Sequence, residues 1–390
     1  NVVENYVSAD NLASSYSSYK ETQLSAAAPY PIQIIDKFSL SDNSTRYLVI
    51  EFYVEYLGAD TLRPTVVSRA DGTERLSATY TLFNGYLKLT DVLTMDNSDF
   101  GYNLSSFNLS SSSDKFLTNT PKTQYCNIND YGTLAFLAPN DTAYNFVLTY
   151  FGSDGSTLGS ESVYRTQANG AYDAFSADVK NQIIYFGCFP GNLQNWSSTF
   201  TAPLLLAGIK GGSIRVQVKD LSGDRVSSAY TINVNCDNLK GYESIRLCWL
   251  NQWGVWDYYT FTKKSTRNIT TQGTTYQQLE GSWNSSRYRL DSYKGGKKAF
   301  RVNATEKISM NTDFVSEDFN TMFEELINSP EVYMLSEYED ISEIFSALNQ
   351  YVTPVRLTTS SFTRKTIAND KLIQYTFEIE KSKTLRTQSV

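Results

Sequence analysis

Apolar side chains recur at every second position in short segments of this chain, and turn-forming residues separate the segments. Residues 145–151, 213–219 and 228–234 follow this pattern. Because successive residues of a β-strand face opposite sides of a sheet, a period of two gives each strand one buried face. Short strands between glycine-containing turns are typical of β-sandwiches and barrels. We therefore expect a mainly β fold.

The N-terminal region adds further strand signals. Residues 46–57 are rich in β-branched and aromatic side chains, which predicts a long central strand. Pro64 places residues 62–69 at the edge of a sheet, because proline lacks the backbone N–H that a central strand donates. The pair Asn84-Gly85 lies between alternating apolar runs in residues 77–89 and predicts a β-hairpin there.

One segment near the C-terminus has the period of a helix. It begins with Ser316 as a capping residue, and Asn328-Ser329-Pro330 ends it. Its apolar residues recur at intervals of three and four: Phe319, Met322, Phe323, Leu326 and Ile327. This spacing predicts an amphipathic helix with one buried face. A second, shorter helical stretch is expected at residues 341–348.

These patterns divide the chain into four parts. Residues 1–44 are rich in Ser, Ala, Asn and Tyr and predict an extended N-terminal arm that reaches another subunit. Residues 45–165 and 166–262 are expected to form two β-sandwich-like domains. Residues 263–390 are expected to form an α+β assembly domain with one helix packed on an antiparallel sheet. In this domain the strands at 353–363 and 371–381 should pair with each other.

The segment from Leu247 to Phe261 is the most aromatic part of the chain and predicts a strand, a turn and a second strand. Aliphatic residues alternate with its rings, which favours a core or subunit interface over an exposed lectin-like platform. We interpret it as a hinge that packs the β-sandwich half onto the C-terminal half. The residues expected to serve packing and assembly here and in the helix are Trp249, Trp253, Trp256, Tyr258, Tyr259, Phe319 and Phe323.

Composition narrows the chemistry. The chain contains no histidine, which removes Ser-His-Asp and Cys-His catalytic sites and His-ligated metals. We expect no catalytic residues, no metal and no cofactor. A net charge of -7 argues against nucleic acid as a partner. The basic cluster of Lys294, Lys297, Lys298 and Arg301 is interpreted as a solvated hairpin. No apolar run is long enough for membrane insertion.

The four cysteines are widely spaced, without a C-x-x-C pair. We expect four buried free thiols at Cys126, Cys188, Cys236 and Cys248. A bridge from Cys236 to Cys248 across adjacent strands is the alternative.

Three segments carry a resemblance to a known class of proteins: residues 183–193, residues 248–264 with the sequence CWLNQWGVWDYYTFTKK, and residues 359–376. Over residues 170–390 the chain resembles virion structural proteins of tailed bacteriophages. The resemblance implies a non-enzymatic component of the tail, neck or collar. It also implies several copies around the tail axis, with other virion proteins as partners. Residues 1–170 do not share it clearly and could form a decoration or adhesion module.

Two alternatives belong to other classes of function. The first is a carbohydrate-binding adhesin that recognises a host-surface glycan through Trp196, Trp253 and Trp283. The second is a hydrolase that uses only carboxylates, with Asp173 or Asp257 beside aromatic rings that stack on a sugar. No pair of carboxylates at a diagnostic spacing supports the hydrolase.

Overall fold

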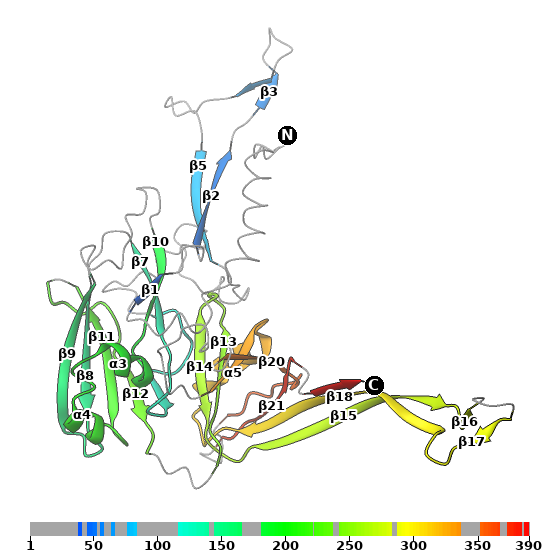
Figure 1. The fold of residues 1–390 in the computed structure, drawn as a ribbon. Coiled ribbons are helices and arrows are strands. Elements are labelled where there is room, and N and C mark those ends of the chain that lie inside the picture. Colours follow the sequence, from blue (N-terminus) through cyan, green and yellow to red (C-terminus); the bar gives the residue numbers. More distant parts are fainter. Residues whose placement is uncertain are drawn as a thin grey trace. The chain divides into compact units, whose positions relative to one another are not determined.

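The fold is mainly β, as the sequence predicts (Figure 1). The computed structural model describes residues 38–40, 45–52, 55–57, 64–66, 76–83, 116–139, 144–165, 181–220, 222–236, 242–282, 287–336, 352–366, 373–383 and 386–389. The chain forms two compact units. The first comprises residues 1–124, 130–235 and 251–257, and the second comprises residues 125–129, 236–250 and 258–390.

The first unit contains a three-stranded sheet and a five-stranded sheet, except that Tyr125 and Cys126 of the latter belong to the second unit. The smaller sheet has the order β1 (Phe38–Leu40), β10 (Asn181–Phe186), β7 (Leu134–Pro139). The larger has the order β6 (Thr123–Cys126), β12 (Tyr230–Val234), β11 (Ser213–Lys219), β8 (Tyr144–Phe151), β9 (Thr157–Arg165). The Phe146 ring of the larger sheet lies 5.2 Å from Phe136 and 4.5 Å from Phe186, both on the smaller sheet. The two sheets therefore pack face to face as a sandwich.

The boundary expected between residues 165 and 166 does not separate two domains in this unit. Strand β8 pairs with β11, and β7 pairs with β10, so strands from both sides of the boundary share each sheet. Two short helices follow β10 and precede β11 in the sequence: α3 (Pro190–Trp196) and α4 (Pro203–Gly208). Alternation of apolar residues predicts that a segment is a strand, but it carries no information about which distant strand becomes its partner.

The predicted strand at residues 46–57 is two strands. Strand β2 (Thr45–Phe52) pairs with β5 (Leu76–Phe83), and β3 (Glu55–Leu57) pairs with β4 (Pro64–Val66). The Asn84-Gly85 turn, the helical stretch at residues 341–348 and the N-terminal arm before β1 lie outside the described residues.

The second unit is built on an eight-stranded sheet. Its order is β14 (Trp256–Phe261), β13 (Ile245–Leu250), β19 (Val332–Leu335), β20 (Val352–Leu357), β21 (Thr376–Lys381), β18 (Gly296–Asn311), β15 (Thr266–Gln278), and β22 (Arg386–Ser389) also pairs with β18. The turn at residues 251–254 and the start of β14 belong to the first unit. The expected pairing of the last two long strands is confirmed, because β20 pairs with β21.

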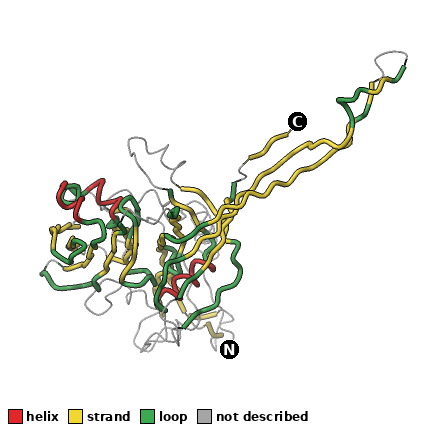
Figure 2. Tube along the Cα trace, turned by 90° about the horizontal axis from the view of Figure 1, so that it is seen from below, coloured by secondary structure: helices red, strands yellow, loops and turns green. Residues whose placement is uncertain are grey.

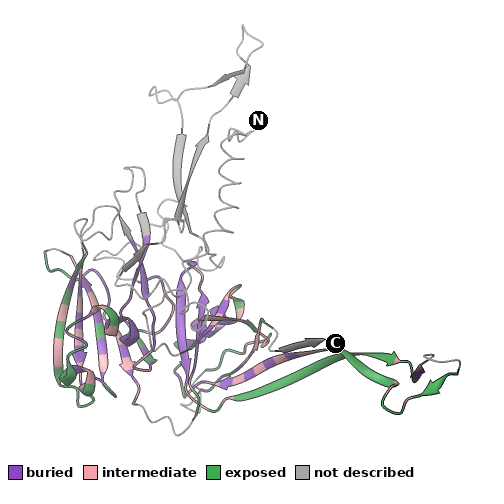
Figure 3. Ribbon diagram, viewed as in Figure 1, coloured by how far each residue is buried: buried purple, intermediate pink, exposed green. Residues whose placement is uncertain are grey.

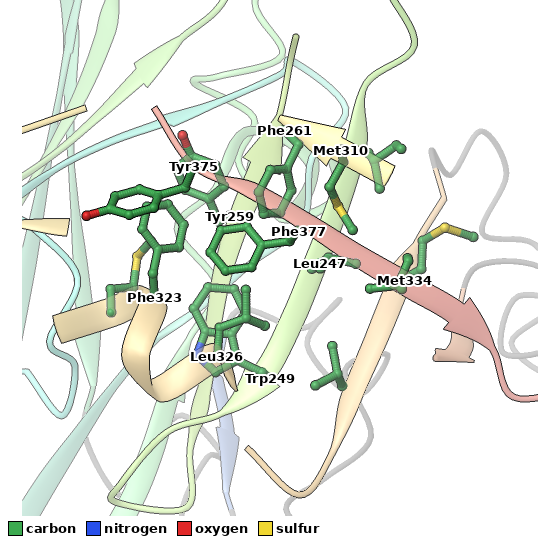
Figure 4. Close-up of a cluster of buried hydrophobic side chains, with 14 of the residues drawn as sticks. Leu247, Trp249, Tyr259, Phe261, Met310, Phe323, Leu326, Met334, Tyr375 and Phe377 are labelled. Atoms are coloured by element: carbon green, nitrogen blue, oxygen red, sulfur yellow. The ribbon is translucent and has the colours of Figure 1, made fainter. Parts of the chain in front are cut away.

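Helix α5 (Phe319–Asn328) lies against this sheet, as Figure 4 shows. Phe323 contacts rings of the sheet at centroid distances of 5.1 Å to Tyr259 and 5.2 Å to Phe377. The predicted amphipathic helix is confirmed, although it begins three residues after Ser316. Its buried apolar residues join Leu247, Trp249 and Phe261 in one cluster that forms the core of this unit.

Candidate interaction site: the hairpin arm

The aromatic hairpin of β13 and β14 is core structure. Every residue of both strands is buried, which Figure 3 shows as a continuous purple band. All seven residues expected to serve packing are buried, and Trp249, Tyr259, Phe319 and Phe323 share the core cluster of the second unit. The remaining three are Trp253, Trp256 and Tyr258. Their side chains do not form an exposed platform. Their part in assembly, and the role of the segment as a hinge, stay predictions.

Asp257 lies in a buried hydrogen-bond network of the first unit. Its carboxylate accepts hydrogen bonds from the Thr118 hydroxyl at 2.6 Å and from the Asn251 side-chain amide at 3.1 Å. The Asn251 amide also donates to the Leu117 carbonyl at 2.9 Å, which ties the hairpin turn to residues 117–118. Burial raises the pKa of Asp257 to about 7, and the two hydrogen bonds oppose that rise. This carboxylate holds a turn in place and does not face solvent.

The two described tryptophans of the predicted glycan site are not exposed. The Trp196 indole is partly buried and donates to the Gly187 carbonyl at 2.9 Å, while Trp253 is buried. Asp173 and Trp283 lie outside the described residues. Of the four cysteines, Cys126, Cys188 and Cys248 are buried, but Cys236 is exposed, and all four are free thiols. The expectation that Cys236 is buried is therefore wrong, and the alternative bridge to Cys248 does not form.

The feature that stands apart is a long β-hairpin that projects from the sheet of the second unit (Figures 1 and 2). It consists of β15, the distal half of β18 and the tip between them, which contains β16 (Gly281–Ser282) and β17 (Arg289–Leu290). We call residues 266–303 the hairpin arm. Strands β15 and β18 pair from Thr266–Ser309 at the base to Gln278–Gly296 near the tip, with one register shift between Thr274 and Thr275.

The hairpin arm is exposed on both faces. Residues 266–277 of β15 and 296–301 of β18 are all exposed, without the buried–exposed alternation of a strand that covers a core. Ile269, Tyr276 and Phe300 are the large apolar side chains exposed on these strands, and further ones are exposed toward the tip. The most exposed are Tyr293 at 74%, Leu290 at 73% and Leu279 at 65%, all near the tip. Leucines at such exposure near one end of a projecting element are typical of a contact surface.

Ion pairs hold the base of the arm. Glu306 of β18 is 5% exposed and pairs with Arg267 at 2.8 Å and with Lys381 of β21 at 2.7 Å. Arg267 also pairs with Glu243. Hydrogen bonds from Lys381 and Arg267 lower the pKa of the Glu306 carboxyl. This network links the base of both arm strands to β21 of the sheet.

The arm is basic on an acidic chain. Residues 266–303 contain seven basic and two acidic residues, a net charge of +5, whereas the whole chain has a net charge of -7. Of the four basic residues predicted to lie on a solvated hairpin, Lys297, Lys298 and Arg301 are exposed on β18 of this arm, whereas Lys294 is half-buried and pairs with Asp291 at 2.8 Å. The remainder of the chain therefore carries a net charge of -12.

Other kinds of site are not found in the described part of the chain. No group of three or more His, Cys, Asp or Glu side chains among these residues could hold a metal ion. No helix in the described ranges is both long and apolar enough to cross a membrane. No protein-family model, curated protein or solved structure matches the chain.

Sequence reasoning missed the arm as a site. Its first strand, TRNITTQGTTYQQ, is rich in β-branched threonine but has no apolar face, so a search for alternating apolar residues passes over it. The signal that could have found it is a strand-forming segment with no hydrophobic period, followed by a net positive turn.

Proposed function

We propose that the chain is a non-enzymatic structural component of a bacteriophage virion, in the tail, neck or collar. In this proposal several copies assemble around the tail axis and contact other virion proteins. The observation that carries the assembly role is the hairpin arm, which is exposed on both faces. The virion assignment rests on the resemblance of residues 170–390 to tailed-phage structural proteins.

The physical reason is that a two-stranded ribbon is marginally stable in water by itself. On the tip side of Ala304, β15 and β18 pair with each other and β18 also pairs with the short β22, while β16 and β17 pair at the tip. The exposed residues of the distal half cover no core. Exposed leucines and an open strand edge gain stability when a second chain covers them. A subunit of an assembly can therefore gain stability from such an element.

The test is to shorten the arm. Thr271 pairs directly with Ala304, so residues 272–303 can be replaced by an Asn-Gly turn that joins the two strands. We expect the shortened chain to keep a melting temperature within a few degrees of the full chain, because the core cluster contains no residue of the deleted segment. We expect light scattering after size exclusion to show loss of the multi-copy species.

The particle itself supplies the second measurement. Antibodies against the arm tip should label one region of the virion in electron microscopy. A full chain that stays monomeric, together with virions that no antibody labels, would refute the proposal.

A carbohydrate-binding adhesin is the second candidate, favoured by the exposed Tyr288 and Tyr293 rings at the arm tip. Aromatic faces of this kind can stack on sugars. Glycan-array binding that is lost in Tyr293→Ala, with assembly unchanged, would support this candidate. Binding to no glycan by a correctly assembled protein would exclude it for the glycans on the array.

A further inference from the structure

We infer that the outer edge of β15 is a docking edge for β15 of a second copy, in antiparallel orientation. This inference rests on the proposed assembly role and names the partner. The two strands would form a continuous four-stranded ribbon, β18–β15–β15–β18, across a two-fold axis.

The first support is the position of β15 in the sheet. It is a terminal strand, paired with β18 on one side, and no described strand pairs with its other side. Of the other edge strands in this sheet, β14 is buried along its whole length and β22 has only four residues, so neither offers a long open edge. An exposed edge of 13 residues, about 40 Å of strand, is a long template for strand addition.

The second support is that this edge lacks protection. Proteins block edge strands with proline, lysine, inward charges or bulges. Residues 266–278 contain no proline, lysine, aspartate or glutamate, and Arg267 at the base is their single charge. The one irregularity in the hairpin falls on β18, where Phe300 has no partner in β15. The outer strand is therefore regular from end to end.

The third support is that the strand is compatible with itself. Antiparallel pairing centred on Gln272 sets Arg267 opposite Gln277 and Ile269 opposite Thr275 of the second copy. No charge meets a like charge, and threonine faces threonine at positions 270 and 274, a favourable cross-strand pair.

Charge gives the orientation. Antiparallel pairing carries each basic tip toward the base of the arm of the other copy. A parallel arrangement would instead set the two basic tips side by side, each on an arm with a net charge of +5. Because this contact is isologous it closes as a pair, and growth to a larger ring would use a different surface.

Cysteine cross-linking tests the register. In a Cys236→Ser background, which removes the exposed native thiol, Gln272→Cys should form a disulfide-linked dimer under mild oxidation. Directly opposed residues of antiparallel strands have Cα atoms about 4.5–5.5 Å apart, within disulfide range. A mixture of Arg267→Cys and Gln277→Cys chains should give the mixed dimer.

The matched control is Tyr293→Cys, because Tyr293 is also exposed but lies at the tip. In the antiparallel arrangement the two tips lie about 40 Å or more apart, so this variant should stay uncross-linked. Dimers from Tyr293→Cys but not from Gln272→Cys would overturn the inference.

Charged substitutions on β15 test whether this edge contributes to the free energy of dimer formation. Positions 270 and 274 face each other across the axis, so Thr270→Lys with Thr274→Lys sets lysine against lysine twice. We expect its dimer dissociation constant to rise about tenfold. Thr270→Lys with Thr274→Glu restores opposite charges and should stay within about threefold of the parent chain.

The outcomes separate the two proposals. If the full chain forms a multi-copy species that none of these β15 variants changes, and Gln272→Cys fails to cross-link, the inference is wrong and the assembly role stands. If the full chain is monomeric and absent from the virion, both are wrong.

Discussion

At the scale of single residues, Asp257 shows how a polar group can specify a turn. Both donors to its carboxylate, the Thr118 hydroxyl and the Asn251 amide, are neutral, so no cation offsets the removal of its charge from water. The Asn251 side chain also accepts the backbone N–H of Trp253 at 3.0 Å, which fixes the turn directly. The network therefore fixes the conformation of the turn, and the buried charge of Asp257 lowers the stability of the fold.

We predict that this charge makes stability fall as pH rises. The folded-state pKa of Asp257, about 7, lies above the value of about 3.9 for an unfolded chain. Between these values the folded state binds more protons than the unfolded state, so the contribution of this group to stability is full at low pH and is lost as pH rises toward 7.

Asp257→Asn should abolish that contribution and raise the free energy of unfolding by about 1–3 kcal/mol at alkaline pH. Asparagine has the same shape as aspartate. In the variant the Thr118 hydroxyl can accept a hydrogen bond from the new amide and donate its own proton to the Thr120 hydroxyl, whose oxygen lies 2.7 Å from it in the parent structure. Denaturant unfolding of both chains across pH 4 to 9 measures the difference. Parallel pH profiles for the two chains would contradict the prediction.

At the scale of elements, the base of the hairpin arm is stabilised by charge where the arm leaves the core. Glu306 faces two cations and is almost fully buried, whereas Glu378 pairs with Lys307 at 3.6 Å on the surface. These two glutamates lie on neighbouring strands of the same sheet, and Glu306 is both more buried and more closely paired.

We predict that Glu306→Gln lowers the free energy of unfolding of the chain by about 1–3 kcal/mol, because Arg267 and Lys381 lose a partly buried partner. Glu378→Gln, the matched control, should change it by less than about 0.5 kcal/mol. Because the pKa of Glu306 is lowered in the folded state, its contribution to the free energy of unfolding is present above the unfolded-state pKa and is lost as pH falls. Equal effects of the two substitutions in denaturant titrations would refute this assignment.

The elements also show which parts of the fold the sequence predicts. Helix α5 was predictable because Phe319, Met322, Phe323 and Leu326 recur with the helical period and Pro330 follows its end. The pairing of β20 with β21 was predictable because two strand-forming segments follow each other near the end of the chain. The arm was not, because both of its faces are solvated and hydrophobic period measures only contact with a core.

At the scale of the whole molecule, long-range pairing limits what sequence alone can give. The expected domain boundary at residue 165 failed because β8 pairs with β11 more than sixty residues later along the chain. No local signal encodes that choice. Charge, in contrast, is additive along the sequence, so the separation of a basic arm from an acidic remainder is visible without any structure.

That separation leads to a prediction about salt. If a basic arm contacts the acidic remainder of another copy, screening should weaken self-association, since the Debye length falls from about 10 Å at 0.1 M salt to about 3 Å at 1 M. We expect the dissociation constant, measured by sedimentation equilibrium, to rise about tenfold over this range. Lys297→Gln with Lys298→Gln should associate more weakly at low salt and respond less to added salt, because both side chains are exposed on the arm. Association that strengthens with salt in the parent chain would show instead that the exposed leucines of the tip, and not its charges, dominate the contact.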